Sequence, residues 1–231
     1  MNKQISLYND LLLLLDEVFR EPKSFWENFY NDREKEIPFF QTEGPDENLV
    51  AYFNKGYKPL RALELGCGPG RNAIYMARQG CEVDAIDLSK NAINWAIERA
   101  FEKEVSINFQ CVSLFDMELE PNKYDFIYDS GLFHHLPPHR RITYLEILQR
   151  ALKKNGYFGL VCFTPEGAIP TSDLEIYKEQ SLKGGIGYTE ERLRGIFEKD
   201  FRILQFRRMV QSSSKEIFGE DFLWTSFMQK K

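Results

Sequence analysis

The sequence predicts a doubly wound α/β fold with a mainly parallel, seven-stranded sheet and a C-terminal antiparallel strand pair. Three observations predict it: strand-like runs alternate with amphipathic helical patterns after about residue 58, a glycine-rich turn joins the first strand to the first helix, and no long helical pattern separates the last two strands. Strands that are linked by helices need right-handed crossovers, which make them parallel. Consecutive strands without such a crossover pair antiparallel.

Five short, apolar runs bounded by turn residues predict the parallel strands. They are Ala62–Leu65, Val83–Leu88, Ile107–Val112, Tyr124–Tyr128 and Tyr157–Phe163. Two later runs, Phe201–Val210 and Phe222–Gln229, are joined by a polar loop and should form the antiparallel pair at one side of the sheet.

Three helices are predicted between these strands. The first begins near Gly70 and stops at Gly80, because glycine readily takes the left-handed conformation that ends helices. The second is N-capped by Ser89 and carries its apolar residues on one stripe. The third follows the proline pair at positions 137 and 138 and should end near residue 155.

Residues 1–58 are expected to form a helical cap or lid, and residues 59–231 the main domain. Aromatic residues within Phe25–Tyr30 recur at helical spacing and give a short helix one aromatic face. Ordinary core packing explains such a face. A segment before the first strand can also fold over the crevice at the carboxyl ends of the strands, in which case Trp26 and Tyr30 would face a ligand.

Composition fits a folded chain, with 43% hydrophobic and 28% charged residues in 231. The formal net charge of −5 lacks the broad positive field that binds phosphates, so no nucleic-acid partner is expected. The longest aliphatic run, Leu11–Leu15, is too short for a membrane span, and no secretory signal is recognisable, which predicts a cytoplasmic protein with no membrane partner. The four cysteines lack ligand spacing, so buried free thiols and no metal site are expected.

The motif that carries chemistry is Glu64-Leu65-Gly66-Cys67-Gly68-Pro69-Gly70, directly between the first strand and the first helix. Glycines at such a turn let a ligand approach the main chain, and N–H groups at the helix start suit an electronegative group. Asp87 closes the second strand, where a carboxylate can accept both hydrogen bonds of a ribose diol. Together they predict a nucleoside site. The dinucleotide fingerprint is GxGxxG, whereas the third glycine here falls one position early.

With Glu64, this glycine order resembles the ExGxGxG loop of class I S-adenosylmethionine-dependent methyltransferases. The resemblance runs from about Arg61 to Phe163 and implies a Rossmann-like methyltransferase fold with S-adenosyl-L-methionine as the cofactor. It further implies that Glu64 orients the ammonium group of the cofactor, Asp87 binds the ribose hydroxyls and Leu88 lies against adenine. The loop residues expected beside the methionine part are Gly66, Cys67, Gly68 and Gly70, with Asn72 just beyond.

The sequence departs from the family after the third strand. Many members carry an acid there that bonds the adenine amino group, but Ser113 occupies the position in this chain. The Ser113 hydroxyl and the Leu114 main chain are therefore expected to hold adenine. Asp129 lies near the end of the fourth strand, which in the family meets the transferable methyl group.

A narrower resemblance is carried by Gly70-Arg71-Asn72-Ala73 and Asp87-Leu88-Ser89, which are similar to the tellurite-resistance and thiopurine methyltransferase group. Members of that group act on small, soft or heterocyclic acceptors. The resemblance implies methyl transfer to a small-molecule acceptor, an in-line displacement that mainly requires alignment in a dry pocket.

His134 and His135 follow the fourth strand and are the candidate catalytic bases for an acceptor that must lose a proton. A packing role for one of them and solvent exposure for the other is the competing interpretation. The irregular stretch Thr164–Gly187 is a second candidate for contact with the acceptor, or a surface connection. Two further functions stay open: an NAD(P)-dependent Rossmann oxidoreductase and a noncatalytic regulator that binds S-adenosylmethionine.

Overall fold

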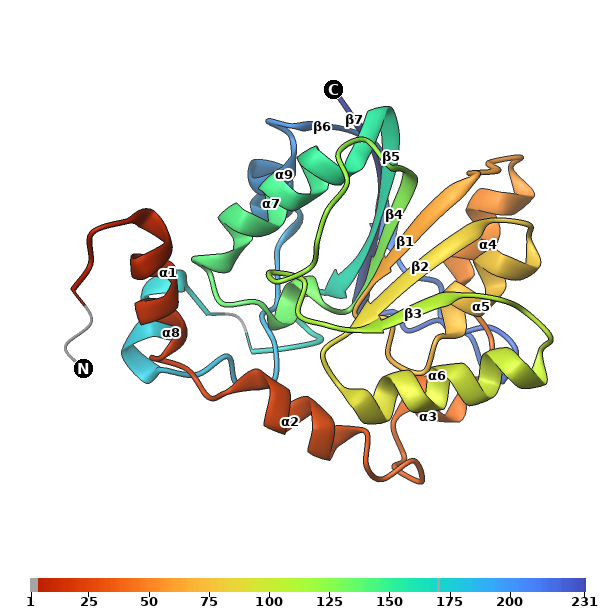
Figure 1. Ribbon diagram of the computed structural model, residues 1–231, viewed down its shortest axis with the longest axis horizontal. Coiled ribbons are helices and arrows are strands. Elements are labelled where there is room, and N and C mark those ends of the chain that lie inside the picture. Colours follow the sequence, from red (N-terminus) through yellow and green to blue (C-terminus); the bar gives the residue numbers. More distant parts are fainter. Residues whose placement is uncertain (1–3, 170) are drawn as a thin grey trace.

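The computed structural model describes residues 4–169 and 171–231, and within these residues one seven-stranded sheet has helices on both faces (Figure 1). The strand order is β3-β2-β1-β4-β5-β7-β6. Strands β1 to β5 pair parallel, whereas β7 pairs antiparallel with both β5 and β6. The strands are β1 Arg61–Leu65, β2 Glu82–Asp87, β3 Asn108–Cys111, β4 Tyr124–Ser130, β5 Leu152–Phe163, β6 Phe201–Arg208 and β7 Leu223–Lys230. The predicted fold class is confirmed.

Helices cover the two faces of the sheet in separate groups, α4, α5 and α6 on one side and α7 and α9 on the other (Figure 1). Each group closes its own apolar core: Leu49, Met76 and Ile93 pack on one face, and Tyr144, Leu148 and Phe197 on the other. The helices are α1 Tyr8–Asp16, α2 Pro22–Phe29, α3 Pro38–Gln41, α4 Glu47–Asn54, α5 Arg71–Arg78, α6 Lys90–Glu102, η1 Phe133–His135, α7 Arg140–Ala151, α8 Asp173–Glu179 and α9 Glu190–Phe197.

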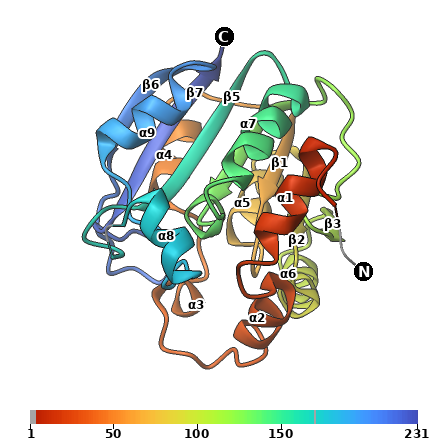
Figure 2. The same ribbon diagram turned by 90° about the vertical axis from the view of Figure 1, so that its left-hand side faces the viewer.

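The N-terminal helices lie at the end of the sheet where the parallel strands finish. Figures 1 and 2 show α2 beside the start of α6. Contacts between α2 and α6 agree with this view. Segments far apart in the sequence therefore meet over the glycine-rich turn.

Two expectations about the elements were wrong. The third predicted helix ends at Ala151 rather than near residue 155, because β5 already begins at Leu152, which pairs with Tyr124. The stretch 164–187 is not irregular throughout, since it contains α8. Ser172 and Glu175 form a capping box at the start of this helix, an S-x-x-E signal that the sequence displays.

Cysteine placement is correct for three of the four residues. Cys67, Cys81 and Cys162 are buried free thiols, but Cys111 is exposed because it ends β3, the edge strand of the sheet. In the described part of the chain, no helix has both the length and the apolar character that crossing a membrane requires.

Candidate cofactor site and reaction loop

The glycine-rich turn has a backbone that only glycine adopts without strain. Gly66, Gly68 and Gly70 have φ values of 62°, 50° and 75°, all in the left-handed region. The Gly70 N–H donates to the Cys67 carbonyl at 2.9 Å, and the Cys67 N–H donates to Ile86 at the same distance. The turn is thereby fixed to the end of β2 and leads directly into α5.

Asp87 connects the end of β2 to this turn. Its Oδ2 accepts the Gly68 N–H and its Oδ1 accepts the Ser89 N–H, both at 2.9 Å. Burial raises the pKa of Asp87 to about 6 in spite of these hydrogen bonds. A carboxylate oxygen that accepts one N–H can accept further hydrogen bonds, so the group retains capacity for a sugar diol.

Glu64 lies below the turn and is only 2% exposed. Its Oε2 accepts the Ala73 N–H at 2.7 Å, in the first turn of α5. Burial, followed by the negative charge of Asp46, raises the pKa of Glu64 to about 8. An ammonium group beside this carboxyl would favour its ionised form, because an opposite charge lowers the pKa of an acid.

The predicted adenine side is built by the segment after β3. The Ser113 Oγ accepts the Phe115 N–H at 3.2 Å, which leaves the hydroxyl hydrogen free to donate. Leu114 is buried, and Leu88 is half-buried at the end of β2. The Leu88 carbonyl lies 3.7 Å from the Cys111 sulfur.

Tyr30, which follows α2, covers the turn from the opposite side. Its hydroxyl lies 2.8 Å from the position that a Cβ on Gly68 would occupy, and its side chain is buried. Leu132 approaches the equivalent position at Gly66 to 3.0 Å. Tyr30 and Leu132, which come from distant segments of the chain, therefore cover the turn.

Glu27 fastens α2 to the start of α6. Its carboxylate accepts hydrogen bonds from the Ser89 hydroxyl at 2.8 Å and the Asn91 N–H at 3.2 Å, and its carbonyl accepts from the Asn91 side chain at 3.0 Å. Although burial opposes it, these hydrogen bonds lower the pKa of Glu27. Sequence reasoning missed Glu27, because an acid on an amphipathic helix carries no signal for a partner 62 residues away.

His134 is enclosed by packing. Its ring stacks on Phe163 at 3.8 Å between ring centroids, and its Nδ1 accepts the Phe163 N–H at 3.3 Å. Its carbonyl accepts the Ile186 N–H at 2.8 Å. Burial holds the pKa of His134 well below its usual value, so the ring is neutral at physiological pH.

His135 faces the aromatic side of α2 instead. Its ring packs edge-on against Trp26 at 4.8 Å between centroids. Burial, with a smaller effect from the Arg20 charge, lowers the pKa of His135 to about 3. The structure thus brings Trp26 and one of the two predicted bases together.

Asp129 organises the loop that carries both histidines. Its carboxylate accepts the Leu132 N–H at 2.8 Å, the Phe133 N–H at 3.3 Å and the Tyr144 hydroxyl at 2.6 Å. Burial raises the pKa of Asp129 to about 7. Sequence reasoning placed Asp129 beside the cofactor and missed this positioning role, which depends on Tyr144 of α7.

A polar cluster fastens α1 on the histidine side of the site. Asp16 accepts hydrogen bonds from Arg140 Nε at 3.0 Å and lies 2.8 Å from His139 Nε2. The other ring nitrogen of His139 lies 2.7 Å from the Tyr177 hydroxyl of α8. Sequence reasoning did not single out His139, because its partners on α1 and α8 lie 123 and 38 residues away.

Residues 62–156, which include the glycine-rich turn and Asp87, match a protein family described as "Methyltransferase domain". The probable S-adenosyl-L-methionine-dependent methyltransferase TehB of Haemophilus influenzae is 26% identical over 148 residues, 64% of this chain and 48% of TehB. Residues 62–156 are a methyltransferase domain, as the resemblance to class I S-adenosylmethionine-dependent methyltransferases predicts. The likeness to TehB supports the narrower resemblance to the tellurite-resistance group.

Other relatives match this chain over shorter stretches. A methyltransferase of Schizosaccharomyces pombe is 35% identical over 72 residues, which are 31% of this chain and 50% of the relative. The ubiquinone biosynthesis O-methyltransferase of Chromobacterium violaceum is 33% identical over 78 residues, 33% of this chain and 34% of that enzyme. This chain therefore spans about half, or less, of the length of these relatives.

Solved structures share the methyltransferase fold over most of the chain. A protein from a study of the conversion of a disulfide bond into a thioacetal group during echinomycin biosynthesis has a TM-score of 0.71 at 20% identity, covering 91% of this chain and 93% of its own. The 1,6-didemethyltoxoflavin-N1-methyltransferase of Burkholderia thailandensis has a TM-score of 0.68 at 18% identity, covering 100% and 93%. The latter was solved with 1,6-didemethyltoxoflavin and S-adenosylhomocysteine bound.

Proposed function

We propose that the protein transfers the methyl group of S-adenosylmethionine to a small-molecule acceptor by in-line displacement at the sulfonium carbon. One observation carries this proposal: Asp87 is hydrogen-bonded to the GxGxG turn, and Tyr30 covers that turn. The B. thailandensis neighbour, which bound a small heterocycle together with S-adenosylhomocysteine, supports it.

In this proposal the cofactor lies across the turn. Gly66, Gly68 and Gly70 pass beside its methionine part, Glu64 orients its ammonium group and Asp87 binds its ribose. Adenine lies between Leu88 and the segment of Ser113 and Leu114. The cofactor supplies the methyl group, and the chain excludes water and aligns the acceptor.

We propose residues 1–58 as the lid of this site. Tyr30 covers the turn, Trp26 contacts the histidine loop, and Glu27 ties their helix to α6. Aromatic faces suit both a sulfonium cation and a flat acceptor. A lid with these contacts would close the cofactor and the acceptor under one helix.

Cofactor binding and turnover distinguish the three candidate functions. We expect S-adenosylhomocysteine to bind with micromolar affinity in isothermal titration calorimetry and NAD(H) or NADP(H) not to bind. A panel of phenols, thiols and nitrogen heterocycles with methyl-labelled S-adenosylmethionine should then yield a labelled product. Binding of a nicotinamide cofactor would favour an oxidoreductase, and tight S-adenosylmethionine binding without turnover on the whole panel would favour a regulator.

The histidine loop gives a separate prediction about acid–base chemistry. A general base works best when its pKa is near the operating pH, whereas the pKa of His135 is about 3 in this structure. We therefore expect His135→Gln to change the KM for the acceptor more than kcat, with S-adenosylhomocysteine affinity unchanged. Steady-state kinetics across pH 6–9 measures this.

His134→Gln is the companion variant in that experiment. Because His134 is stacked on Phe163, we expect this substitution to lower the melting temperature without changing the pH profile of kcat. A fall in kcat of about 100-fold or more for either variant, with unchanged stability, would instead assign general base catalysis to that histidine.

A further inference from the structure

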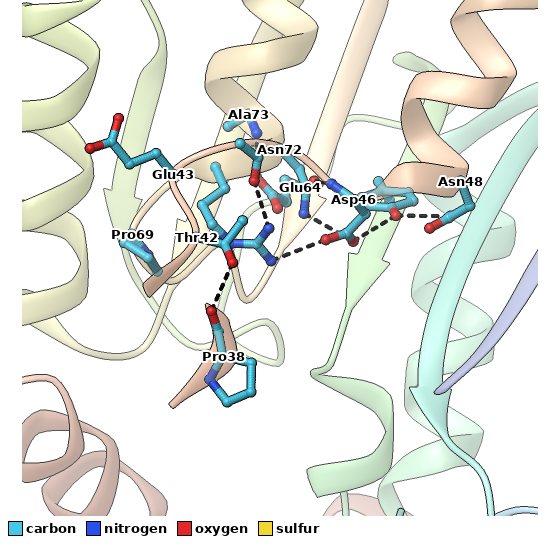
Figure 3. Close-up of polar contacts among 12 residues, drawn as sticks. Pro38, Thr42, Glu43, Asp46, Asn48, Glu64, Pro69, Asn72 and Ala73 are labelled. Atoms are coloured by element: carbon cyan, nitrogen blue, oxygen red, sulfur yellow. Dashed lines mark hydrogen bonds and ion pairs between the residues drawn. The ribbon is translucent and has the colours of Figure 1, made fainter. Parts of the chain in front are cut away.

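Asp46 occupies the N-cap position of α4 but does not cap the helix. An aspartate at this position usually accepts an N–H of the first helical turn, yet no such hydrogen bond is made here. The side chain is completely buried and turns toward the start of α5 instead (Figure 3). A buried carboxylate that gives up its usual local partner has another role in the fold.

That carboxylate is the centre of a polar network behind the glycine-rich turn. Its Oδ1 accepts from Arg71 at 3.0 Å, and its Oδ2 accepts from the Tyr128 hydroxyl at 2.8 Å and from Asn72 Nδ2 at 3.3 Å. The Asp46 N–H donates to Asn72 Oδ1 at 2.9 Å. Both members of the Arg71–Asp46 ion pair are buried, with side-chain exposures of 6% and 0%.

The network reaches Glu64 through Asn72 and Arg71. Figure 3 shows Glu64, Asn72 and Asp46 side by side behind the start of α5. Asn72 bonds Asp46, and its side chain, like the charge of Arg71, favours the ionised form of Glu64. The charge of Asp46 raises the pKa of Glu64, and the charge of Arg71 lowers it.

The other titratable groups that face Glu64 are Cys67 on the turn and Tyr30 after α2. Burial, followed by the charge of Asp87, raises the pKa of both side chains far above neutrality, so both are uncharged there. Among the described residues, Asp46 and Arg71 are the charged side chains with the largest effects on the pKa of Glu64.

We infer that Asp46 is a positioning residue for cofactor binding, which holds Arg71 and Asn72 behind the glycine-rich turn and controls through its charge when Glu64 can receive the ammonium group of the cofactor. This inference rests on the proposed function of Glu64. It gives the N-terminal segment an electrostatic role in the site, in addition to covering it.

The pH dependence of cofactor affinity tests this role. If the ionised form of Glu64 binds the ammonium group, the affinity for S-adenosylhomocysteine should rise by about tenfold per pH unit between the pKa of Asp87, about 6, and the pKa of Glu64, about 8. Asp46→Asn removes a charge that raises this pKa, so the rise of affinity with pH should occur at lower pH. Arg71→Gln removes a charge that lowers the pKa of Glu64, so the rise of affinity should occur at higher pH.

Two control variants separate charge from structure. Tyr128→Phe removes a hydrogen bond to Asp46 but no charge, so it should reduce affinity at every pH and leave the midpoint in place. Glu64→Gln should abolish the rise of affinity that ends near pH 8, and Asp46→Asn added to this variant should cause no shift of the pH dependence. Thermal melting of each variant identifies any that fails to fold, and the Arg71→Gln measurement stands if Asp46→Asn does not fold.

The outcomes separate the inference from the function on which it rests. Opposite shifts for Asp46→Asn and Arg71→Gln support it. Equal losses of affinity at every pH in both variants, or shifts in the same direction, overturn it while the proposed cofactor site stands. Absence of S-adenosylhomocysteine binding by the unmodified protein at every pH overturns the proposed function itself.

Discussion

Asp87→Ala is expected to weaken S-adenosylhomocysteine binding by about 100-fold or more, because two charge-assisted hydrogen bonds at about 1.5 to 3 kcal/mol each are lost. The substitution also frees the Gly68 and Ser89 N–H groups, which Asp87 accepts at 2.9 Å. The measurement is isothermal titration calorimetry at pH 8, above the pKa of about 6 that burial gives Asp87.

Asp84→Asn is the matched control on the same strand. Asp84 lies near the start of β2, where it bonds Asn108, Tyr124 and Lys123 at the end of the sheet opposite the glycine-rich turn. This variant should keep the affinity of the unmodified protein even if its melting temperature falls. An Asp87→Ala protein that is folded and binds within about threefold of the original, a difference under about 1 kcal/mol, would contradict the ribose assignment.

The second large effect is expected from Gly68→Ala. The new Cβ would stand 2.8 Å from the Tyr30 hydroxyl, and the residue would have to keep a φ of 50°. We expect the melting temperature to fall, since the left-handed strain costs about 1 kcal/mol. We also expect cofactor affinity to fall about tenfold or more, because the new Cβ displaces Tyr30 beside the turn. Calorimetry measures the change in cofactor affinity, and thermal melting measures the change in stability.

Combination with Tyr30→Phe tests whether Tyr30 covers the turn in solution. Removing the hydroxyl gives the new Cβ space, so the double variant should bind more tightly than the two single effects together allow. Gly80→Ala supplies the comparison for strain alone, because Gly80 has a φ of 93° and no atom lies within 4 Å of a Cβ there. Strictly additive losses of affinity for Gly68→Ala and Tyr30→Phe would mean that Tyr30 does not cover the turn in solution.

The sheet, the glycine-rich turn and the place of Asp87 could be predicted because their signals are local. Each strand is a short apolar run, and the turn joins β1 directly to α5, so neighbouring residues determine both. The parallel direction of β1 to β5 followed from the crossovers, and the antiparallel β6–β7 pair followed from the lack of one. The end of α7 was misplaced because the pairing of Leu152 with Tyr124 overrides the helical pattern.

The hydrogen bonds that hold α2 over the site and the network behind the turn could not be predicted, because their partners lie far apart in the sequence. Glu27 bonds Ser89, and Asp46 bonds residues of α5 and β4, across separations of 25 to 82 residues. Asp46 even carries a local signal for helix capping, which the packed structure does not use. The role of Asp129 similarly depended on Tyr144.

The contacts of α2 have a kinetic consequence under the proposed function. Trp26 and Tyr30 belong to one short segment, yet one contacts the histidine loop and the other covers the glycine-rich turn. The methylated product and S-adenosylhomocysteine would then leave the site by the same route, which opens only when the hydrogen bonds of Glu27 to Ser89 and Asn91 break. Such coupling makes departure of the two products a common slow step, so that acceptors of very different nucleophilicity would turn over at similar rates.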